Sequence, residues 1–324
     1  PLIGLIGSSL FEGKSLPFFL KGGQAIGLTM MLTCMALLGP CAVMPRCVTV
    51  AYAALESMMP GIGLNLFTAL FGGLALAITL MKNSIMKIVG TVLSPLLLIS
   101  LLMIIAKGMG SHLEFAPSSM SQVAAFQEGM LTGYDTLDLI ASLFFSVTIW
   151  KMLSKNGPHV VKSALFSSLV GGTCLALIYA GLCFVTAGHA ADLQGIAPDR
   201  LLSTLAFMQL GPFYGAIANI AIALACMTTI ISISITITHV IQDDFKVAKP
   251  SRKWINAAIL AITTLCANWG FEHLMEVIHF MATLLYPSII ILTLCNIANK
   301  LYEWRFIKSP VAATLSLTVL SKIL

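Results

Sequence analysis

Two carboxylates stand at the head of an apolar segment near the middle of the chain. Asp135 and Asp138 follow Gly129 and Gly133 in a stretch that is otherwise apolar enough to cross a bilayer. An ionised Asp at the centre of a membrane helix costs about 2.5–3.5 kcal/mol, so it is retained where it faces protein, water or a cation. Glycines weaken a helix, and a break exposes carbonyl and amide groups as ligands. We therefore predict a discontinuous membrane helix at a transport site. The alternative is an ordinary helix that begins near Thr136, with both acids solvated in its first turn.

A cationic side chain also stands inside an apolar segment. Arg46 follows Pro40 and Pro45, and each proline removes a backbone hydrogen bond and frees a carbonyl one turn upstream. A guanidinium at membrane depth needs a carboxylate, carbonyl groups or an aqueous path. Alternatively, its long side chain reaches the membrane surface. Its candidate partners are Asp135, Asp138 and Glu56.

Hydroxyl side chains gather in a third segment. Thr228 and Ser232 are four residues apart, so they share one face of a helix. Hydroxyl and carbonyl oxygens suit a hard monovalent cation such as Na⁺, although Ser and Thr also join helices to one another in membranes. The alternation over Ser232–Thr238 is typical of a strand. Because an isolated strand cannot span a membrane, we predict a helix.

The histidines and cysteines of the chain indicate less about its function. His273 and His279 stand among acids but do not form HExxH, and they lie about 240° apart around a helix. A proton-linked role suits them better than a metal. The eight cysteines form no CxxC pair, so we predict small buried hydrophobic residues without a disulfide or metal role. No nucleotide-binding or hydrolase motif is present, which leaves an ion gradient as the ordinary energy source, with no cofactor.

The elements that position these groups are membrane helices. Hydrophobic residues make up 58 % of the chain and charged residues 10 %, whereas soluble domains have about 45–50 % and about 25 %. The net charge of +5 is modest and falls in alternate loops, so it indicates topology rather than nucleic-acid binding. The composition predicts an all-α polytopic membrane protein that lies in a lipid bilayer.

Spanning helices need about 20 apolar residues. The apolar segments predict about nine spans plus a stub within one transmembrane domain, at residues 1–10 (partial), 24–55, 63–81, 88–106, 129–152, 163–187, 211–241, 254–268, 274–297 and 310–324. Alternate loops carry fourteen basic residues: Lys14, Lys21, Lys82, Lys87, Lys151, Lys155, Lys162, Lys246, Lys249, Arg252, Lys253, Lys300, Arg305 and Lys308. The other loops carry only Lys107 and Arg200, so the first set is predicted to be cytoplasmic. The loop charges Asp192, Asp199 and Arg200 are expected to be solvated.

Several of these runs resemble the branched-chain amino acid–cation symporter family. The run GPCAVMPRCVTV at Gly39–Val50 resembles the family motif GPxxxxPRTATVSFE, and GYDTLDLIA at Gly133–Ala141 resembles GYLTMDxLA. Asn268 and the pair Tyr286–Pro287 fit a late NLG … YPP region. The match covers most of the chain. It departs from the pattern at Asp135, where the family has an apolar residue.

The resemblance implies a LeuT-like bundle of the amino acid–polyamine–cation type, built from two inverted repeats. It implies uptake of leucine, isoleucine and valine across a bacterial inner membrane, coupled to Na⁺ or to H⁺, and no enzyme activity. The substrate is expected at the unwound backbone, with the site residues Gly133, Tyr134, Thr136, Leu137, Asp138 and Phe144. The cation is expected at Thr228, Thr229 and Ser232. Structural and gating roles are expected for Pro40, Pro45, Arg46 and Glu56.

The resemblance also places Pro1 within the second helix of the family. The first helix, which would supply amide and carbonyl ligands, is then absent, and the chain as it stands is not expected to transport. Two other functions stay open, a transport-incompetent remnant or fragment of such a carrier and an intramembrane aspartyl enzyme. The enzyme is disfavoured because aspartyl intramembrane proteases carry their two acids on different helices, whereas Asp135 and Asp138 share one segment.

Overall fold

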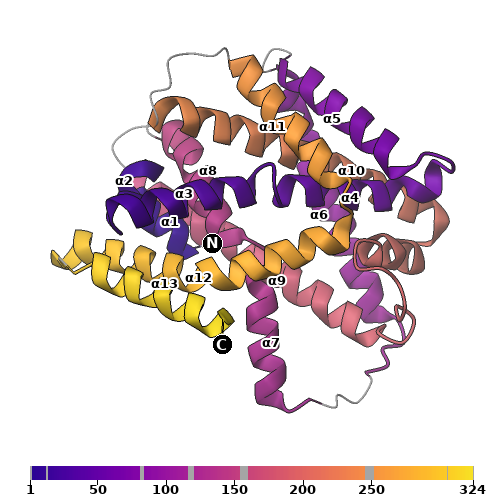
Figure 1. The fold of residues 1–324 in the computed structure, drawn as a ribbon. Coiled ribbons are helices and arrows are strands. Elements are labelled where there is room, and N and C mark those ends of the chain that lie inside the picture. The colour runs from indigo at the N-terminus through magenta and orange to yellow at the C-terminus, as the bar shows by residue number, and fades with distance from the viewer. Residues whose placement is uncertain are drawn as a thin grey trace.

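The computed structural model describes residues 2–11, 14–80, 84–115, 120–153, 160–244, 252–304 and 306–323, and within these ranges every regular element is a helix (Figure 1). The α-helices are α1 Leu2–Ser9, α2 Ser15–Leu20, α3 Gln24–Leu38, α4 Val43–Leu55, α5 Leu64–Leu80, α6 Ser84–Gly110, α7 Gln122–Tyr134, α8 Asp138–Leu153, α9 Val160–Gly188, α10 Leu201–Asp244, α11 Arg252–Ala267, α12 Phe271–Tyr302 and α13 Lys308–Ile323. A short 3₁₀ helix, η1 Glu56–Met58, follows α4.

Within the described ranges, four helical stretches are long and apolar enough to cross a membrane, namely 24–58, 165–188, 201–242 and 271–302. Two shorter apolar helices cover 64–80 and 95–110. The all-α prediction is confirmed for the described residues, and Ser232–Thr238 is helical. The number of spans stays a prediction. Five of the basic residues that suggested the topology lie outside the described residues: Lys82, Lys155, Lys246, Lys249 and Arg305.

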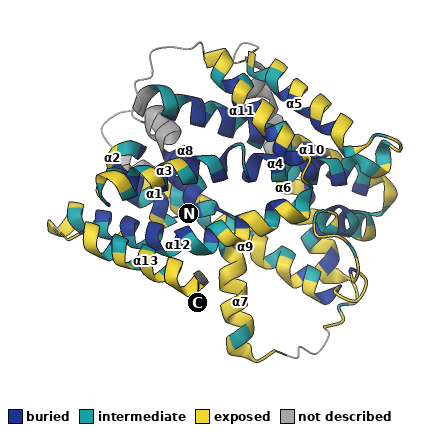
Figure 2. Ribbon diagram, viewed as in Figure 1, coloured by how far each residue is buried: buried dark blue, intermediate teal, exposed yellow. Residues whose placement is uncertain are grey.

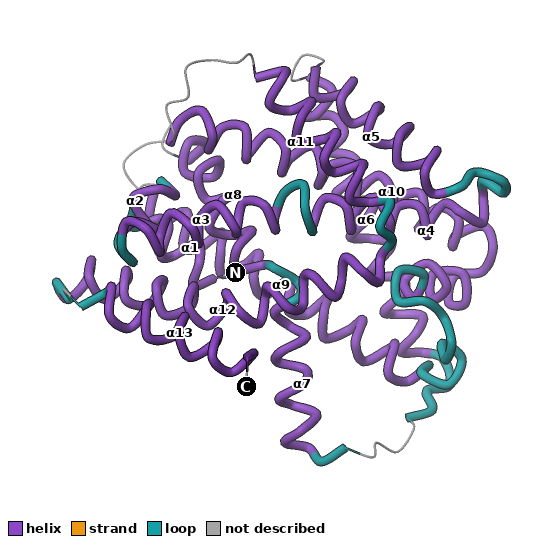
Figure 3. The backbone as a smooth tube through the Cα atoms, in the orientation of Figure 1, coloured by secondary structure: helices purple, strands orange, loops and turns teal. Residues whose placement is uncertain are grey.

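Prolines interrupt the apolar helices in two places. Residues 39–42 separate α3 from α4 by a short loop (Figure 3). Pro40 lies in this loop, and Pro45 lies in the first turn of α4, where its missing N–H costs no intrahelical hydrogen bond. In α10, Gly211 has a φ of 76° and precedes Pro212. Since this φ favours glycine, α10 bends there into two helical parts.

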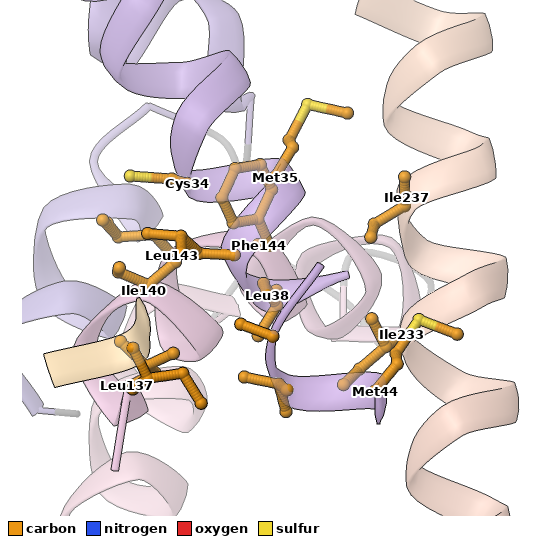
Figure 4. Packing of buried hydrophobic residues seen from close by; sticks show 14 of the residues in the cluster. Cys34, Met35, Leu38, Met44, Leu137, Ile140, Leu143, Phe144, Ile233 and Ile237 are labelled. Atoms are coloured by element: carbon orange, nitrogen blue, oxygen red, sulfur yellow. The ribbon is translucent and has the colours of Figure 1, made fainter. Parts of the chain in front are cut away.

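The main hydrophobic core lies where the two interrupted segments meet α10 and α12. Leu38 and Met44 flank the loop of residues 39–42, and they share one buried cluster with Leu137, Ile140 and Phe144 (Figure 4). Helices α3 and α4 and residues 138–146 of α8 are therefore largely buried, whereas α7 buries no residue (Figure 2). The core thus holds one side of the α7–α8 junction firmly and leaves α7 itself accessible.

A second, smaller core joins the ends of α6 and α9 to the first part of α10. Buried His189 lies at its edge. Its Nδ1–H donates to the carbonyl of Val185 at 2.9 Å. Its Nε2 lies 2.9 Å from the side-chain amide nitrogen of Gln209 and 3.0 Å from Oγ of Ser111, whose own proton goes to the carbonyl of Gly108 at 2.8 Å. The imidazole of His189 therefore connects the ends of α6 and α9 to α10.

The cysteine prediction is partly wrong. All eight cysteines are free; Cys34 and Cys266 are buried, but Cys174 and Cys183 are exposed. Both exposed thiols belong to α9. In a membrane helix an apolar residue gains by facing lipid as much as by facing protein, so composition alone does not separate the two environments.

Gly27 permits the closest contact between α2 and α3. A Cβ atom at this position would collide with the carbonyl oxygen of Phe19 and would lie 2.7 Å from its carbonyl carbon. Because the backbone cannot rotate away as a side chain can, we expect Gly27→Ala to destabilise the protein by about 1–3 kcal/mol. Gly73→Ala is the matched control, since no atom lies within 4 Å of its Cβ position. Thermal unfolding in detergent compares the two, and equal melting temperatures would contradict this packing.

Candidate functional site at the α7–α8 break

The segment that carries the two acids is interrupted. Helix α7 ends at Tyr134 and α8 begins at Asp138. Between them, Leu137 has a φ of 55°, the left-handed conformation that ends a regular helix. Leu137 is 1 % exposed, so core packing holds this strained backbone in place. The predicted discontinuity is confirmed.

The position of the break differs from the prediction. Gly129 and Gly133 both lie inside α7 rather than at the interruption. The last turn is closed by hydrogen bonds from the amide of Asp135 to the carbonyl of Thr132 and from the amide of Leu137 to that of Tyr134, each 3.0 Å long. The packing of Leu137 therefore decides where the helix ends, and the glycines stay helical.

Arg46 holds the backbone of the break. Its Nη1 donates to the carbonyl oxygen of Asp135 at 2.7 Å and lies 3.9 Å from the sulfur of Met275. Of its three predicted partners, Arg46 therefore contacts Asp135. It does so through the backbone carbonyl and not through the carboxylate. The guanidinium is half-buried, and it joins the start of α4 to the α7–α8 junction and to α12.

The Asp135 carboxylate faces α12. Oδ2 lies 2.9 Å and Oδ1 3.2 Å from Nδ1 of His279. The carboxylate side chain is 9 % exposed, whereas the imidazole is 47 % exposed. The alternative in which both acids are simply solvated is therefore wrong for Asp135. No group of three or more His, Cys, Asp or Glu suited to a metal ion occurs in the described ranges.

Asp138 faces α9 from the first turn of α8. The hydroxyl of Tyr179 interacts electrostatically with its carboxylate. Tyr134, the last residue of α7, stacks on Tyr286 with ring centroids 4.8 Å apart. The hydroxyl of Tyr286 is buried close to the first-turn backbone of α8, at Leu139 and Ile140. Tyrosines from α9 and α12 therefore lie beside the break.

A hollow of about 570 Å³ lies between α7 and α9, beside the break. We call it the α7–α9 hollow. Gly129, Gly133 and Thr136 line it from one side, and Tyr179 and Leu182 from the other. Its walls are mainly apolar, and the hydroxyl of Thr136 is turned to the carbonyl of Gly133 at 2.9 Å. Its size suits a small amphipathic molecule.

Phe144 lies apart from the other predicted substrate residues. It is fully buried and stacks on Phe19, with ring centroids 6.1 Å apart (Figure 4). It belongs to α8 two turns beyond the break, so a substrate in the hollow does not reach it. Its role in binding stays a prediction.

The predicted cation residues lie on α10. Thr228 and Thr229 both donate to the carbonyl of Ala225, at 2.8 and 2.9 Å. Ser232 is half-buried one turn further on. No hydrogen bond among the described residues joins these three to the break. Each hydroxyl oxygen still offers lone pairs, since it uses only its proton in the helix.

Glu56, which was predicted to have a structural or gating role, directly follows the C-terminal end of α4. Its Oε2 is 2.7 Å from Nη2 of Arg200, and the two side chains are 34 % and 51 % exposed. Glu56 is therefore not the partner of Arg46, and Arg200 is exposed, as expected, but paired. Beside this ion pair, Arg200, Asp199 and His273 line a second hollow of about 620 Å³.

Sequence reasoning missed Tyr179 and Met275 and did not assign Tyr286 a contact. Tyr179 is one of several hydroxyl residues in α9, so no local signal distinguishes it. The contacts themselves cross between distant helices, so no spacing in the chain reveals them.

The chain is similar to known proteins over its whole length. A family model described as branched-chain amino acid transport protein matches residues 1–324. A protein of Staphylococcus haemolyticus, named as a branched-chain amino acid carrier, is 25 % identical over 99 % of this chain and 76 % of its own length. A protein of Staphylococcus saprophyticus with the same name is 23 % identical over 100 % and 77 %, and one of Staphylococcus aureus is 24 % identical over the same shares.

Proposed function

Because the chain belongs to the branched-chain amino acid transport protein family, we propose that it is a secondary active carrier which takes up leucine, isoleucine and valine together with Na⁺. Membership in this family indicates a carrier rather than an enzyme, and its apolar helices indicate an integral membrane protein. The observation that carries the proposal is the break itself, a helix interruption whose backbone is held by Arg46 and flanked by two acids.

The substrate would bind at the break and in the α7–α9 hollow. An amino acid brings an ammonium group, a carboxylate and an apolar side chain. The carboxylate of Asp138 suits the ammonium, and the positive end of the helix dipole at the start of α8 suits the carboxylate. The mainly apolar walls of the hollow suit a branched aliphatic side chain. Gly133, Tyr134, Thr136 and Leu137 are then the surrounding residues.

The proposal extends to architecture and place in the cell. We place the chain in the bacterial inner membrane as a multi-pass protein, with its helices arranged as the LeuT-like inverted repeat. Two interrupted helix pairs, α3–α4 and α7–α8, support this arrangement, since broken helices supply polar backbone at the midplane of such carriers. The intramembrane aspartyl enzyme is disfavoured, because Asp135 pairs with His279 and Asp138 with Tyr179.

Uptake of labelled leucine by the full-length gene product in liposomes tests the function. We expect accumulation when Na⁺ is high outside and none when an impermeant organic cation replaces it. Isoleucine and valine should compete for uptake, and lysine should not. Indifference of uptake to both the Na⁺ gradient and the pH gradient would eliminate a cation-coupled carrier.

Thr229→Val tests the cation ligands separately. Valine keeps the shape of threonine and removes the oxygen, so we expect the Na⁺ concentration for half-maximal uptake to rise about tenfold. Thr173→Val on α9 is the matched control, because its hydroxyl likewise donates to a helix carbonyl, that of Leu169 at 2.8 Å. The same Na⁺ dependence in both variants would remove Thr229 from the cation site.

A further inference from the structure

The contact between Asp135 and His279 has the geometry of a hydrogen-bonded acid–imidazole pair. Both carboxylate oxygens face one ring nitrogen, Nδ1, at 2.9 and 3.2 Å. An ionised carboxylate only accepts hydrogen bonds, so Nδ1 carries the proton that is shared with it. The second nitrogen, Nε2, belongs to a ring that is 47 % exposed. The imidazole is therefore open on one side of α12, while the carboxylate stays covered.

Charged groups on the helices that surround the Asp135–His279 pair also affect its electrostatics. From α4, the guanidinium of Arg46 contacts the carbonyl of Asp135. From α8, Asp138 acts electrostatically on Tyr179 and on Tyr286, and Arg46 acts on the same Tyr179. The remaining titratable groups on α7 and α12 that stand nearest along the chain are Tyr134, Glu128, Glu272, His273 and Glu276. Of these, Glu128, Glu272, His273 and Glu276 are exposed, so water screens their charges.

Arg46, Asp135, Asp138 and His279 form one cluster at the break. The charges of this cluster do not cancel when the imidazole is neutral. One guanidinium faces two carboxylates, Asp135 and Asp138, which leaves one net negative charge. A single proton on His279 brings the cluster to zero. In a partly desolvated site this change acts strongly on any charged group nearby.

We propose that Asp135 and His279 form a proton-binding site at the helix break. The proton comes from the aqueous phase and binds Nε2 of His279, and the Asp135 carboxylate stabilises the resulting imidazolium through Nδ1–H. No bond other than this N–H bond forms, and the proton returns to water when it dissociates. The consequence for uptake rests on the proposed function: the bound proton changes the charge beside the substrate-binding segment, so leucine uptake depends on pH.

Histidine titration measured by NMR tests the site without transport. The full chain carries ¹³C-labelled histidine in detergent micelles, and the resonance of His279 is the one that disappears in His279→Gln. We expect its chemical shift to change with pH, and to change over a different pH range in Asp135→Asn. Asn is isosteric, and the bond from Arg46 to the backbone carbonyl remains. The resonance of exposed His273 should not respond to Asp135→Asn.

A second variant tests the site if the Asp135→Asn protein does not fold. Asp135→Glu keeps the charge and displaces it by one methylene group, so the titration of His279 should again differ from that of the wild type. A His279 resonance that does not change with pH, or that changes alike in wild type and in the folded Asp135 variant, would overturn the proposal.

Leucine uptake at a fixed Na⁺ gradient supplies the functional measurement. The wild type should change its rate across the range in which His279 titrates, His279→Gln should lose that dependence, and His273→Gln should keep it. An identical pH profile for wild type and His279→Gln would also overturn the proposal. If the wild type carries no leucine at any pH, the carrier function fails, and the NMR titration still decides the proton site.

Discussion

Arg46→Ala is expected to reduce leucine uptake by about a hundredfold, the largest effect of any single substitution at this site. The guanidinium donates a hydrogen bond of 2.7 Å to the carbonyl of Asp135 and so ties α4 to the break. Hydrogen bonds from charged donors contribute about 1.5–3 kcal/mol, and each 1.4 kcal/mol corresponds to about tenfold. Without the guanidinium, the broken backbone loses its donor, and two acids lose the cation nearest to them.

Arg46→Lys separates charge from geometry. Lysine keeps the positive charge but has a single ammonium group in place of the planar fork, so we expect partial recovery of uptake. Arg252→Ala is the matched control, because Arg252 makes one exposed hydrogen bond, to Gln242 at 2.7 Å, far from the break. Uptake and melting temperature are measured for all three variants. An Arg46→Ala protein that melts and transports like the wild type would contradict the role of this contact.

Asp138→Asn is expected to reduce leucine uptake by about ten- to a hundredfold, since it removes a charge that the substrate ammonium needs. Asn is nearly isosteric and is tolerated at the start of a helix. The loss should therefore appear in transport while the melting temperature stays close to that of the wild type. Binding of leucine to the detergent-solubilised protein should weaken in parallel.

Asp192→Asn is the control for Asp138→Asn. Asp192 is an exposed loop residue between α9 and α10, so the substitution changes the net charge by the same amount outside the site. Normal uptake kinetics in Asp138→Asn would remove this carboxylate from the substrate site. Loss of uptake in both variants would indicate instead that the overall charge is what matters.

The two acids of the break have separate functions in this arrangement. Asp135 is covered and paired with the imidazole of His279, whereas Asp138 is half-buried and turned to Tyr179. Their separation arises because Leu137, in its left-handed conformation, turns the chain between them. An uninterrupted helix would place residues three apart on one face, where their like charges would repel.

The sequence by itself determined the helical class, the interruption of the acidic segment and the family resemblance. These depend on local features, namely apolar runs long enough to span a membrane and motifs such as Gly133–Ala141, which are read along the chain. The interruption at Pro40 is of the same kind, because proline acts on its own backbone and one turn upstream. The bend of α10 at Gly211 was not predicted.

Only the tertiary structure decided the position of the break and the partner of each polar group. Leu137 ends the helix because the core buries it, and no property of leucine alone predicts that. Arg46 meets Asp135 across 89 residues, and His279 meets it across 144. Such pairs depend on which helix faces pack together, and that is set by the sum of many weak contacts rather than by spacing in the chain.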